Sequence, residues 1–180
     1  MTESPAQGLA HHLAGIGRYR LLLGIAATVL ILDQTAKIWI QFYSGLPHGV
    51  YPPWAGITII PGFFNLVFST NTGAAWGMFA GYGRVLTLLA VAALAAIFWF
   101  RHSLQLPERR MQVAFGLLCG GIAGNLVDRA AHGYVVDFLD VIIFNYRWPT
   151  FNIADCGITI GVTLYIILSF TRSNAEEDRG

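Results

Sequence analysis

The chain has 180 residues, of which 55% are hydrophobic and only 12% charged, whereas about a quarter of the residues in an ordinary soluble domain are charged. The mean hydropathy of +0.56 points the same way, since a soluble domain must cover its surface with groups that water solvates. A formal net charge of +1 excludes the basic footprint of a nucleic-acid-binding protein. We therefore expect a single membrane-embedded domain that covers residues 1–180.

Four largely uncharged runs are predicted membrane spans, since a bilayer core of about 30 Å needs about 17 to 25 apolar residues per helix. They cover about 21–42, 85–100, 111–127 and 153–171. The first run could instead be a cleaved signal peptide, but Asp33 and Lys37 stand where a cleavage site needs small residues. We predict an all-α polytopic membrane protein with four transmembrane helices.

The basic residues predict how these spans are oriented. One side carries Arg18, Arg20, Arg101, Arg109, Arg110, Arg172 and Arg179, and the other carries only Arg84, Arg129 and Arg147. Because short cytoplasmic loops are enriched in Lys and Arg, we expect both termini to face the cytoplasm.

The segment from Gln41 to Gly83 has no charged residue, which is unusual for a solvated loop of this length. Within it, GITII and FFNLVF flank Pro61-Gly62, a pattern typical of a β-hairpin. We expect a small β-sheet at about 45–70 on the outer face of the membrane.

Polar groups within or beside the membrane are costly, so each needs a partner or a purpose. They form four clusters: Asp33, Gln34 and Lys37; Asn71 to Gly77; Asn125, Asp128 and Arg129, followed by Asp137; and Asn152 with Asp155. Each cluster also has a purely structural interpretation. The first is an i,i+4 ion pair, the second a helix entry or turn, the third a polar network, and the fourth a helix N-cap with an acidic first turn.

Asp137 and Asp155 are expected at one depth, near the outer surface, and lie 18 residues apart in the chain. Two carboxylates that converge cannot both ionise at neutral pH, so they share one proton. One can then deprotonate a water that attacks a peptide carbonyl, while the other protonates the carbonyl oxygen and the leaving amine. Asp140 is a weaker candidate, which we interpret as a surface charge.

Other membrane chemistries lack their motifs. No H-E-x-x-H or G-x-S-x-G occurs, and the outer histidines His48 and His132 are far apart. Cys119 and Cys156 have neither metal-ligand spacing nor a disulfide framework. We predict no metal and no cofactor.

Five motifs occur in one consistent order over residues 32–161: LDQTAK, NTGAAWG, GNLVDR, VVDF and FNIADCGITIG. This set resembles the bacterial lipoprotein signal peptidases, also called signal peptidase II. The resemblance implies a four-span aspartic endopeptidase of the inner membrane with its active site on the periplasmic side. It further implies that the substrate is a diacylglyceryl-modified prolipoprotein, cut on the amino side of the lipidated cysteine.

Residue by residue, the resemblance implies that Asp137 in VVDF and Asp155 in FNIAD are the catalytic pair. Supporting or substrate-contacting residues would be Asp33, Lys37, Asn71, Gly73, Asn125, Asp128, Arg129 and Asn152. It also implies an outer β-sheet and a periplasmic surface helix, which fit the uncharged region before Gly83 and the stretch 137–144. The expected partners are the prolipoprotein and membrane lipids, without nucleic acid, and we expect a monomer.

Three alternatives stay open from the sequence. Intramembrane Asp, Lys and Arg also mark ion pathways, as in a small transporter or proton-conducting protein. The polar clusters could serve only to hold a non-catalytic assembly subunit together. A peptidase could also use Asp128 in place of Asp137.

Overall fold

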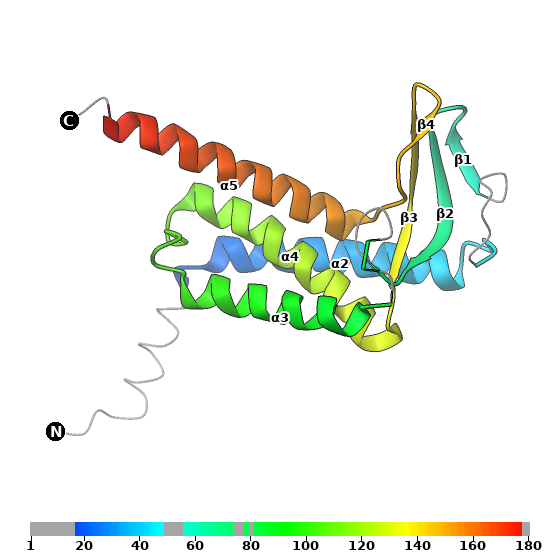
Figure 1. Ribbon diagram of the computed structural model, residues 1–180, viewed down its shortest axis with the longest axis horizontal. Helices are drawn as coiled ribbons and strands as arrows, with labels where there is room; N and C mark the ends of the chain where they lie inside the picture. The colour runs from blue at the N-terminus through cyan, green and yellow to red at the C-terminus, as the bar shows by residue number, and fades with distance from the viewer. Residues whose placement is uncertain (1–16, 49–55, 74–77, 80, 178–180) are drawn as a thin grey trace, which may run out of the picture.

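The computed structural model describes residues 17–48, 56–73, 78–79 and 81–177. In this part of the chain, helices run alongside one another and a sheet stands across one end of the bundle (Figure 1). The helices are α2 (Arg20–Phe42), α3 (Gly83–Trp99), α4 (Arg109–His132) and α5 (Ile153–Glu177). The strands are β1 (Ile57–Ile60), β2 (Phe64–Asn71), β3 (Val135–Ile143) and β4 (Tyr146–Arg147).

Within the described residues, three helices are long and apolar enough to cross a membrane: α2, α4 and the Ile153–Thr171 part of α5. They confirm the predicted helices at 21–42, 111–127 and 153–171, although α4 continues to His132. The predicted span at 85–100 forms α3, which has 17 residues and rises about 26 Å at 1.5 Å per residue. Its crossing of the membrane stays a prediction.

Glycines on α4 allow α2 and α5 to pack closely on either side of it. A Cβ at Gly120 would lie 2.7 Å from the Ala26 carbonyl oxygen of α2, and one at Gly121 would lie 2.8 Å from Ile158 of α5. Small residues at such crossings let helix backbones approach within a membrane, where packing rather than the hydrophobic effect holds helices together. The helix bundle is therefore centred on α4.

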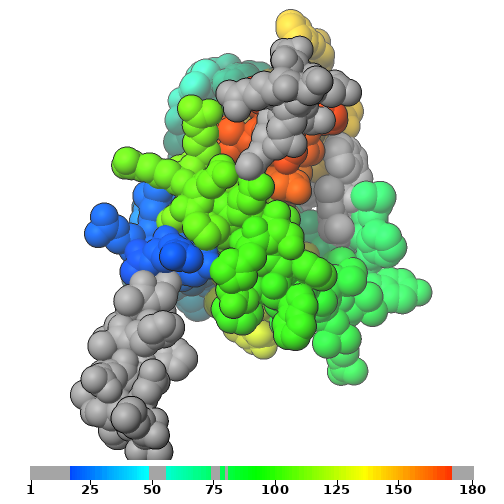
Figure 2. All heavy atoms as spheres, turned by 90° about the vertical axis from the view of Figure 1, so that its left-hand side faces the viewer, coloured from blue at the N-terminus to red at the C-terminus, as the bar shows by residue number. Residues whose placement is uncertain are grey.

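The bundle end opposite the sheet collects the start of α2, the α3–α4 connection and the C-terminal part of α5 (Figure 2). Gln112 of α4 joins two of these segments. Its Nε2 donates to the Arg18 carbonyl at 2.9 Å and to the Pro107 carbonyl at 3.2 Å, and its Oε1 accepts from the Leu22 N–H at 3.3 Å. Most of the basic residues that predict the cytoplasmic side belong to these segments, namely Arg18, Arg20, Arg101, Arg109 and Arg110. The fold thus gathers these basic residues at the end of the bundle opposite the sheet.

The sheet is antiparallel, with the strand order β1-β2-β3-β4. The predicted hairpin around Pro61-Gly62 is confirmed by β1 and β2. The surface helix expected at 137–144 is wrong, because these residues form most of β3, whose β-branched run VVDFLDVII pairs with β2. The sheet therefore extends beyond 45–70 and all-α is too narrow a class. The described residues between Phe42 and Gly83 contain no helix.

The pairing of β2 with β3 is interrupted by a bulge. Leu66 lies opposite Leu139, but Ser69 lies opposite Asp137, so β2 advances three residues while β3 advances two. A bulge of this kind reverses the alternation of one strand relative to its partner. Beyond the bulge, each side chain of β2 therefore lies on the opposite face of the sheet from the one that its sequence distance from Leu66 predicts.

Candidate active site

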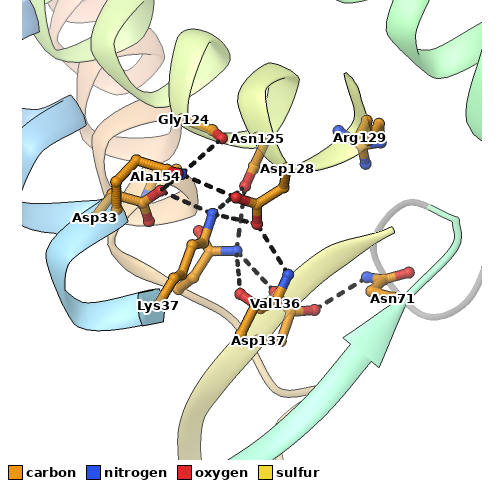
Figure 3. Close-up of polar contacts among 12 residues, drawn as sticks. Asp33, Lys37, Asn71, Gly124, Asn125, Asp128, Arg129, Val136, Asp137 and Ala154 are labelled. Atoms are coloured by element: carbon orange, nitrogen blue, oxygen red, sulfur yellow. Dashed lines mark hydrogen bonds and ion pairs between the residues drawn. The ribbon is translucent and has the colours of Figure 1, made fainter. Parts of the chain in front are cut away.

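Lys37 lies at the centre of a buried ionic cluster at the junction of the helices and the sheet (Figure 3). Its Nζ lies 2.7 Å from Asp33 Oδ2 and 2.9 Å from Asp128 Oδ2, and it donates to Asn125 Oδ1 at 3.0 Å. The exposed fractions of Lys37 and Asp33 are 2% and 0%. Burying these charges costs several kcal/mol per ion unless each has close partners. One cation here offsets two carboxylates.

The remaining carboxylate oxygens of this cluster accept hydrogen bonds from backbone and amide donors. Asp33 Oδ1 accepts from the Ala154 N–H at 2.9 Å, which places an acidic group of α2 at the N-terminus of α5. Asp128 Oδ1 accepts from Gln34 Nε2 at 2.9 Å, and Asp128 Oδ2 also accepts from the Val136 N–H at 3.0 Å. The cluster therefore fixes α2, α4, α5 and β3 relative to one another.

Two asparagines connect Asp137 of β3 with Asp155 of α5. Asn125 Nδ2 donates to Asp155 Oδ1 at 2.8 Å, and Asn152 Nδ2 donates to Asp137 Oδ1 at 2.7 Å. The same Asn152 nitrogen lies 3.2 Å from Asn125 Oδ1. The two carboxylates thus share one chain of neutral amide groups.

Asn152 and Asp155 also form the start of α5. Asn152 Oδ1 accepts from the Asp155 N–H at 2.9 Å, and Asp155 Oδ2 accepts from the Asn152 N–H at 3.2 Å. This reciprocal pair is a capping box, which satisfies two N–H groups that the helix leaves free. It confirms the predicted N-cap with its acidic first turn, and it holds the Asp155 carboxylate at the sheet end of the helix.

The bulge in β2 brings Asn71 to the Asp137 side of β3. Asn71 Nδ2 donates to Asp137 Oδ2 at 3.1 Å, and Asn71 Oδ1 accepts from the Gly73 N–H at 2.9 Å. Arg129 reaches the same segment, with its Nη2 donating to the Gly73 carbonyl at 2.9 Å. The end of α4 and the segment after β2 are therefore held together beside Asp137. The rest of the NTGAAWG motif, 74–77, lies outside the described residues.

The environment of Asp137 favours its protonated form. Its side chain is only 2% exposed, and this burial together with the nearby charge of Asp155 raises its pKa from 3.8 to about 7. Hydrogen bonds from Asn71 and Asn152 and the charge of Lys37 act in the opposite direction but are weaker. At neutral pH this carboxyl group is therefore partly protonated.

The structure brings all ten predicted site residues into this one region. One interpretation is wrong: Asp140 is not a surface charge, because it is 1% exposed, pairs with Arg147 Nε at 3.0 Å and accepts from Asn65 Nδ2 at 2.8 Å. Sequence reasoning missed this second polar cluster on the other face of β3. The available signal was Asn65, a lone amide within the apolar strand FFNLVF.

Metal ligands are not grouped in the part of the chain that the structure describes, where no three His, Cys, Asp or Glu side chains could hold an ion together. Cys119 and Cys156 are both half-buried free thiols. What the site contains is a set of carboxylates and amides around the Lys37 ammonium group, with Arg129 beside it.

A family model described as signal peptidase (SPase) II matches residues 25–171. The chain belongs to the signal peptidase II family. A lipoprotein signal peptidase of Ralstonia nicotianae is 42% identical over 159 residues, which are 85% of this chain and 84% of that protein. One of Mycobacterium avium is 38% identical over 175 residues, which are 94% and 89% of the two chains.

Solved structures agree with this assignment. A bacterial membrane enzyme determined by the in meso method at 2.3 Å resolution superposes with a TM-score of 0.75 and 37% identity, covering 84% of this chain and 88% of that one. A second such structure, at 1.9 Å, gives a TM-score of 0.66 and 36% identity, covering 82% and 90%. The chain is therefore a multi-pass membrane protease of this family, which removes the transporter and assembly-subunit alternatives.

Proposed function

We propose that the protein cleaves the signal peptide from diacylglyceryl-modified prolipoproteins, on the amino side of the lipidated cysteine, with Asp137 and Asp155 as catalytic residues. The observation that carries this proposal is the pair of carboxylates joined by Asn125 and Asn152. The lipoprotein signal peptidases similar to this chain support the substrate class.

The two carboxylates divide the acid and base roles. We assign the shared proton at rest to Asp137, since burial and the Asp155 charge raise its pKa to about 7. Asp155 is then the ionised partner and the general base. Because the two groups interact, the titration that activity follows belongs to the pair.

The reaction balances with these two groups and one water. Asp155 takes a proton from the water as its oxygen attacks the scissile carbonyl carbon, and Asp137 gives its proton to the carbonyl oxygen. The tetrahedral intermediate then collapses, the C–N bond breaks, and the leaving nitrogen is protonated by the pair. The products are a carboxylate on the signal peptide and a free amino group on the lipidated cysteine.

Asp128 is less suited to catalysis than Asp137. Its two oxygens already accept from Gln34, Lys37 and the Val136 N–H, so a water would have to displace a buried donor. We propose supporting roles for Asp128, Asp33 and Lys37 in holding the helix ends. Asn71, Gly73, Asn125, Arg129 and Asn152 would position the pair or contact substrate, and no metal or cofactor takes part.

The proposed setting is the bacterial inner membrane. We propose that α3 is a fourth span, because its large apolar side chains Leu88, Phe98 and Trp99 are more than two-thirds exposed. The basic end of the bundle then faces the cytoplasm and the sheet faces the periplasm. A signal-peptide helix and acyl chains can reach the site laterally from the bilayer. We further propose that the single domain 1–180 acts as a monomer.

The test compares cleavage of a diacylglyceryl-modified prolipoprotein by the parent, Asp137→Asn and Asp155→Asn in lipid. Each variant should cut about 10²- to 10⁴-fold more slowly, the range that general acid–base groups contribute. An amide at position 155 still accepts from the Asn152 N–H, so the helix cap is kept. Activity within tenfold of the parent in either variant would refute the pair.

Asp140→Asn is the matched control, since it neutralises another buried carboxylate only three residues along β3. It breaks the ion pair with Arg147 and should lower the thermal midpoint while preserving cleavage per folded molecule. Asp128→Asn, assayed in parallel, tests the alternative dyad. A folded Asp128→Asn that is as inactive as Asp137→Asn would favour that alternative.

A further inference from the structure

The end of the sheet farthest from α3 carries an exposed apolar surface. We call it the sheet tip and define it as Ile60, Phe63, Ile143, Phe144, Tyr146 and Trp148. Between 43% and 100% of each of these side chains is exposed. Soluble monomers rarely leave a contiguous apolar patch of this kind uncovered.

Two hairpin turns build the sheet tip. Phe144 and Asn145 form the two-residue turn between β3 and β4, with φ of +47° and +65°, as in a type I′ turn. The Ile142 N–H donates to the Phe63 carbonyl at 2.8 Å, which fixes the β1–β2 turn beside it. Phe144 is 100% exposed in a left-handed conformation that costs a non-glycine residue about 1 kcal/mol or more. Contacts within the described chain do not explain this aromatic residue.

The sheet tip has no free charge. Residues 57–64 and 141–146 contain no Asp, Glu, Lys or Arg. Arg147, which follows directly, pairs with the buried Asp140 at 3.0 Å. The tip therefore combines aliphatic residues with Tyr146 and Trp148, the two residue types enriched where a membrane meets water.

The placement of the tip relative to the helices points to one occupant. The sheet stands across the ends of the membrane helices, and both turns extend sideways past α5 (top of Figure 1). The neighbouring helix α5 has exposed apolar side chains, among them Ile160, Ile167 and Phe170, as expected of a helix in lipid. The sheet tip thus continues a lipid-facing surface at the level where the helices end.

We propose that the sheet tip inserts into the headgroup and acyl boundary of the outer leaflet and anchors the sheet to the bilayer. Its apolar side chains enter the lipid beside α5, and the rings of Tyr146 and Trp148 lie at the headgroups. The proposal depends on the membrane fold and not on the proposed catalytic pair.

Fluorescence quenching tests this placement with the full chain in vesicles of phosphatidylethanolamine and phosphatidylglycerol. The contribution of Trp148 is the difference between the parent and Trp148→Phe. We expect lipids brominated near the headgroup end of the acyl chain to quench it strongly, and iodide in the water to quench it little. Tyr146→Trp adds a second reporter and should increase the quenched signal, which covers the case in which Trp148→Phe does not fold.

Phe144→Asn separates anchoring from folding, because Asn tolerates the left-handed turn better than Phe. This variant should keep or raise the thermal midpoint in detergent but lose most of the bromolipid quenching of Trp148. The matched control is Phe79→Asn, another exposed phenylalanine with a positive φ of +58° in the segment before α3, which should leave the quenching unchanged.

Two results would overturn the proposal. Strong iodide quenching without bromolipid quenching would place the tip in water. Protection from both quenchers would show that protein covers it, as in contact with a second copy of the chain.

Discussion

The ionic cluster around Lys37 and the pair Asp137–Asp155 are neighbours, but their carboxylates have different kinds of bonding partner. Asp33 and Asp128 each contact the Lys37 ammonium group and a backbone N–H. Among the described residues, Asp137 accepts hydrogen bonds from the neutral amides of Asn71 and Asn152. Asp155 accepts from Asn125 and from the N–H of its own helix cap.

In the proposed mechanism, this difference separates carboxylates that hold the structure together from those that react. A carboxylate that is paired with a cation holds elements together, whereas one that is bound only by amides keeps its ability to exchange a proton. The amides orient Asp137 and Asp155 without neutralising them. Replacing the cation should therefore affect stability first, and replacing the amides should affect the proton equilibrium first.

The largest effect on stability is expected from Lys37→Met, which removes the cation between Asp33 and Asp128. Two buried carboxylates then lose their shared partner, which should cost about 3–5 kcal/mol of unfolding free energy. Chemical denaturation in detergent measures it. Arg147→Met is the control, because that ion pair is more exposed and should cost less. A loss below about 1 kcal/mol for Lys37→Met would contradict the assigned role.

Gly124→Ala strains the same cluster without changing its charge. The added Cβ would lie 2.7 Å from Asp33 Oδ2 and 3.1 Å from the Ala154 side chain, so we expect a loss of about 1–3 kcal/mol. Gly24→Ala on α2 meets nothing within 4 Å and should instead stabilise by up to about 1 kcal/mol. The contrast in thermal midpoint checks both, and equal shifts would argue against close packing at Gly124.

The pH dependence of cleavage should report the dyad and not the ionic cluster. Because the pKa of Asp137 is raised to about 7, the shared proton is lost above that pH, and kcat should fall about tenfold per pH unit there. A rate that stays flat up to pH 9 in substrate-saturating conditions would rule out Asp137 as the proton donor.

The free energy of unfolding should also depend on pH, because the pKa of Asp137 differs between the folded and unfolded chain. The pKa of Asp137 is higher in the folded chain than its ordinary value of 3.8, so its contribution to stability is complete below about pH 4 and is lost as the pH rises through about 7. Asp137→Asn lacks this loss. Relative to the parent, that variant should therefore gain stability between pH 4 and 8, as thermal unfolding at the two pH values would show.

The smallest effect is expected from Asn71→Ala. Its hydrogen bond lowers the pKa of Asp137, so removing it should move the alkaline limb of the rate profile upward by less than about one pH unit. Asn65→Ala is matched in strand and chemistry but contacts Asp140 on the other face. Asn65→Ala should leave the alkaline limb of the rate profile where it is in the parent. A shift of equal size in both variants would show that the effect is not local to Asp137.

Much of the helical part of the site could be predicted from residue type and spacing. Asp33 and Lys37 stand four residues apart on one helix face, and Asn152 precedes an apolar run in the N-cap position with Asp155 three residues later. These are local patterns that the helix period determines. The structure has them as expected.

The strand part could not be predicted in the same way. The first four residues of β3 are buried, so its sequence does not show the alternation of apolar and polar residues that identifies a half-buried strand. The three-residue spacing of Asp137 and Asp140 suits one face of a helix but opposite faces of a strand. The surface position expected for Asp140 was therefore wrong. The surface helix, which only the family resemblance implied, was wrong because these residues form β3. Which residue of β2 meets Asp137 depends on tertiary pairing alone.

The bulge between Leu66 and Ser69 adds one residue to β2, and this exchanges the two faces of the sheet for every later residue of the strand. Asn65 and Asn71 are six residues apart and would lie on one face of a regular strand, yet they serve Asp140 and Asp137 on opposite faces of β3. Removing one residue at the bulge would leave the first half of the strand in phase and exchange the faces of the second half. In this segment, chain length is as much a determinant of the site as residue identity.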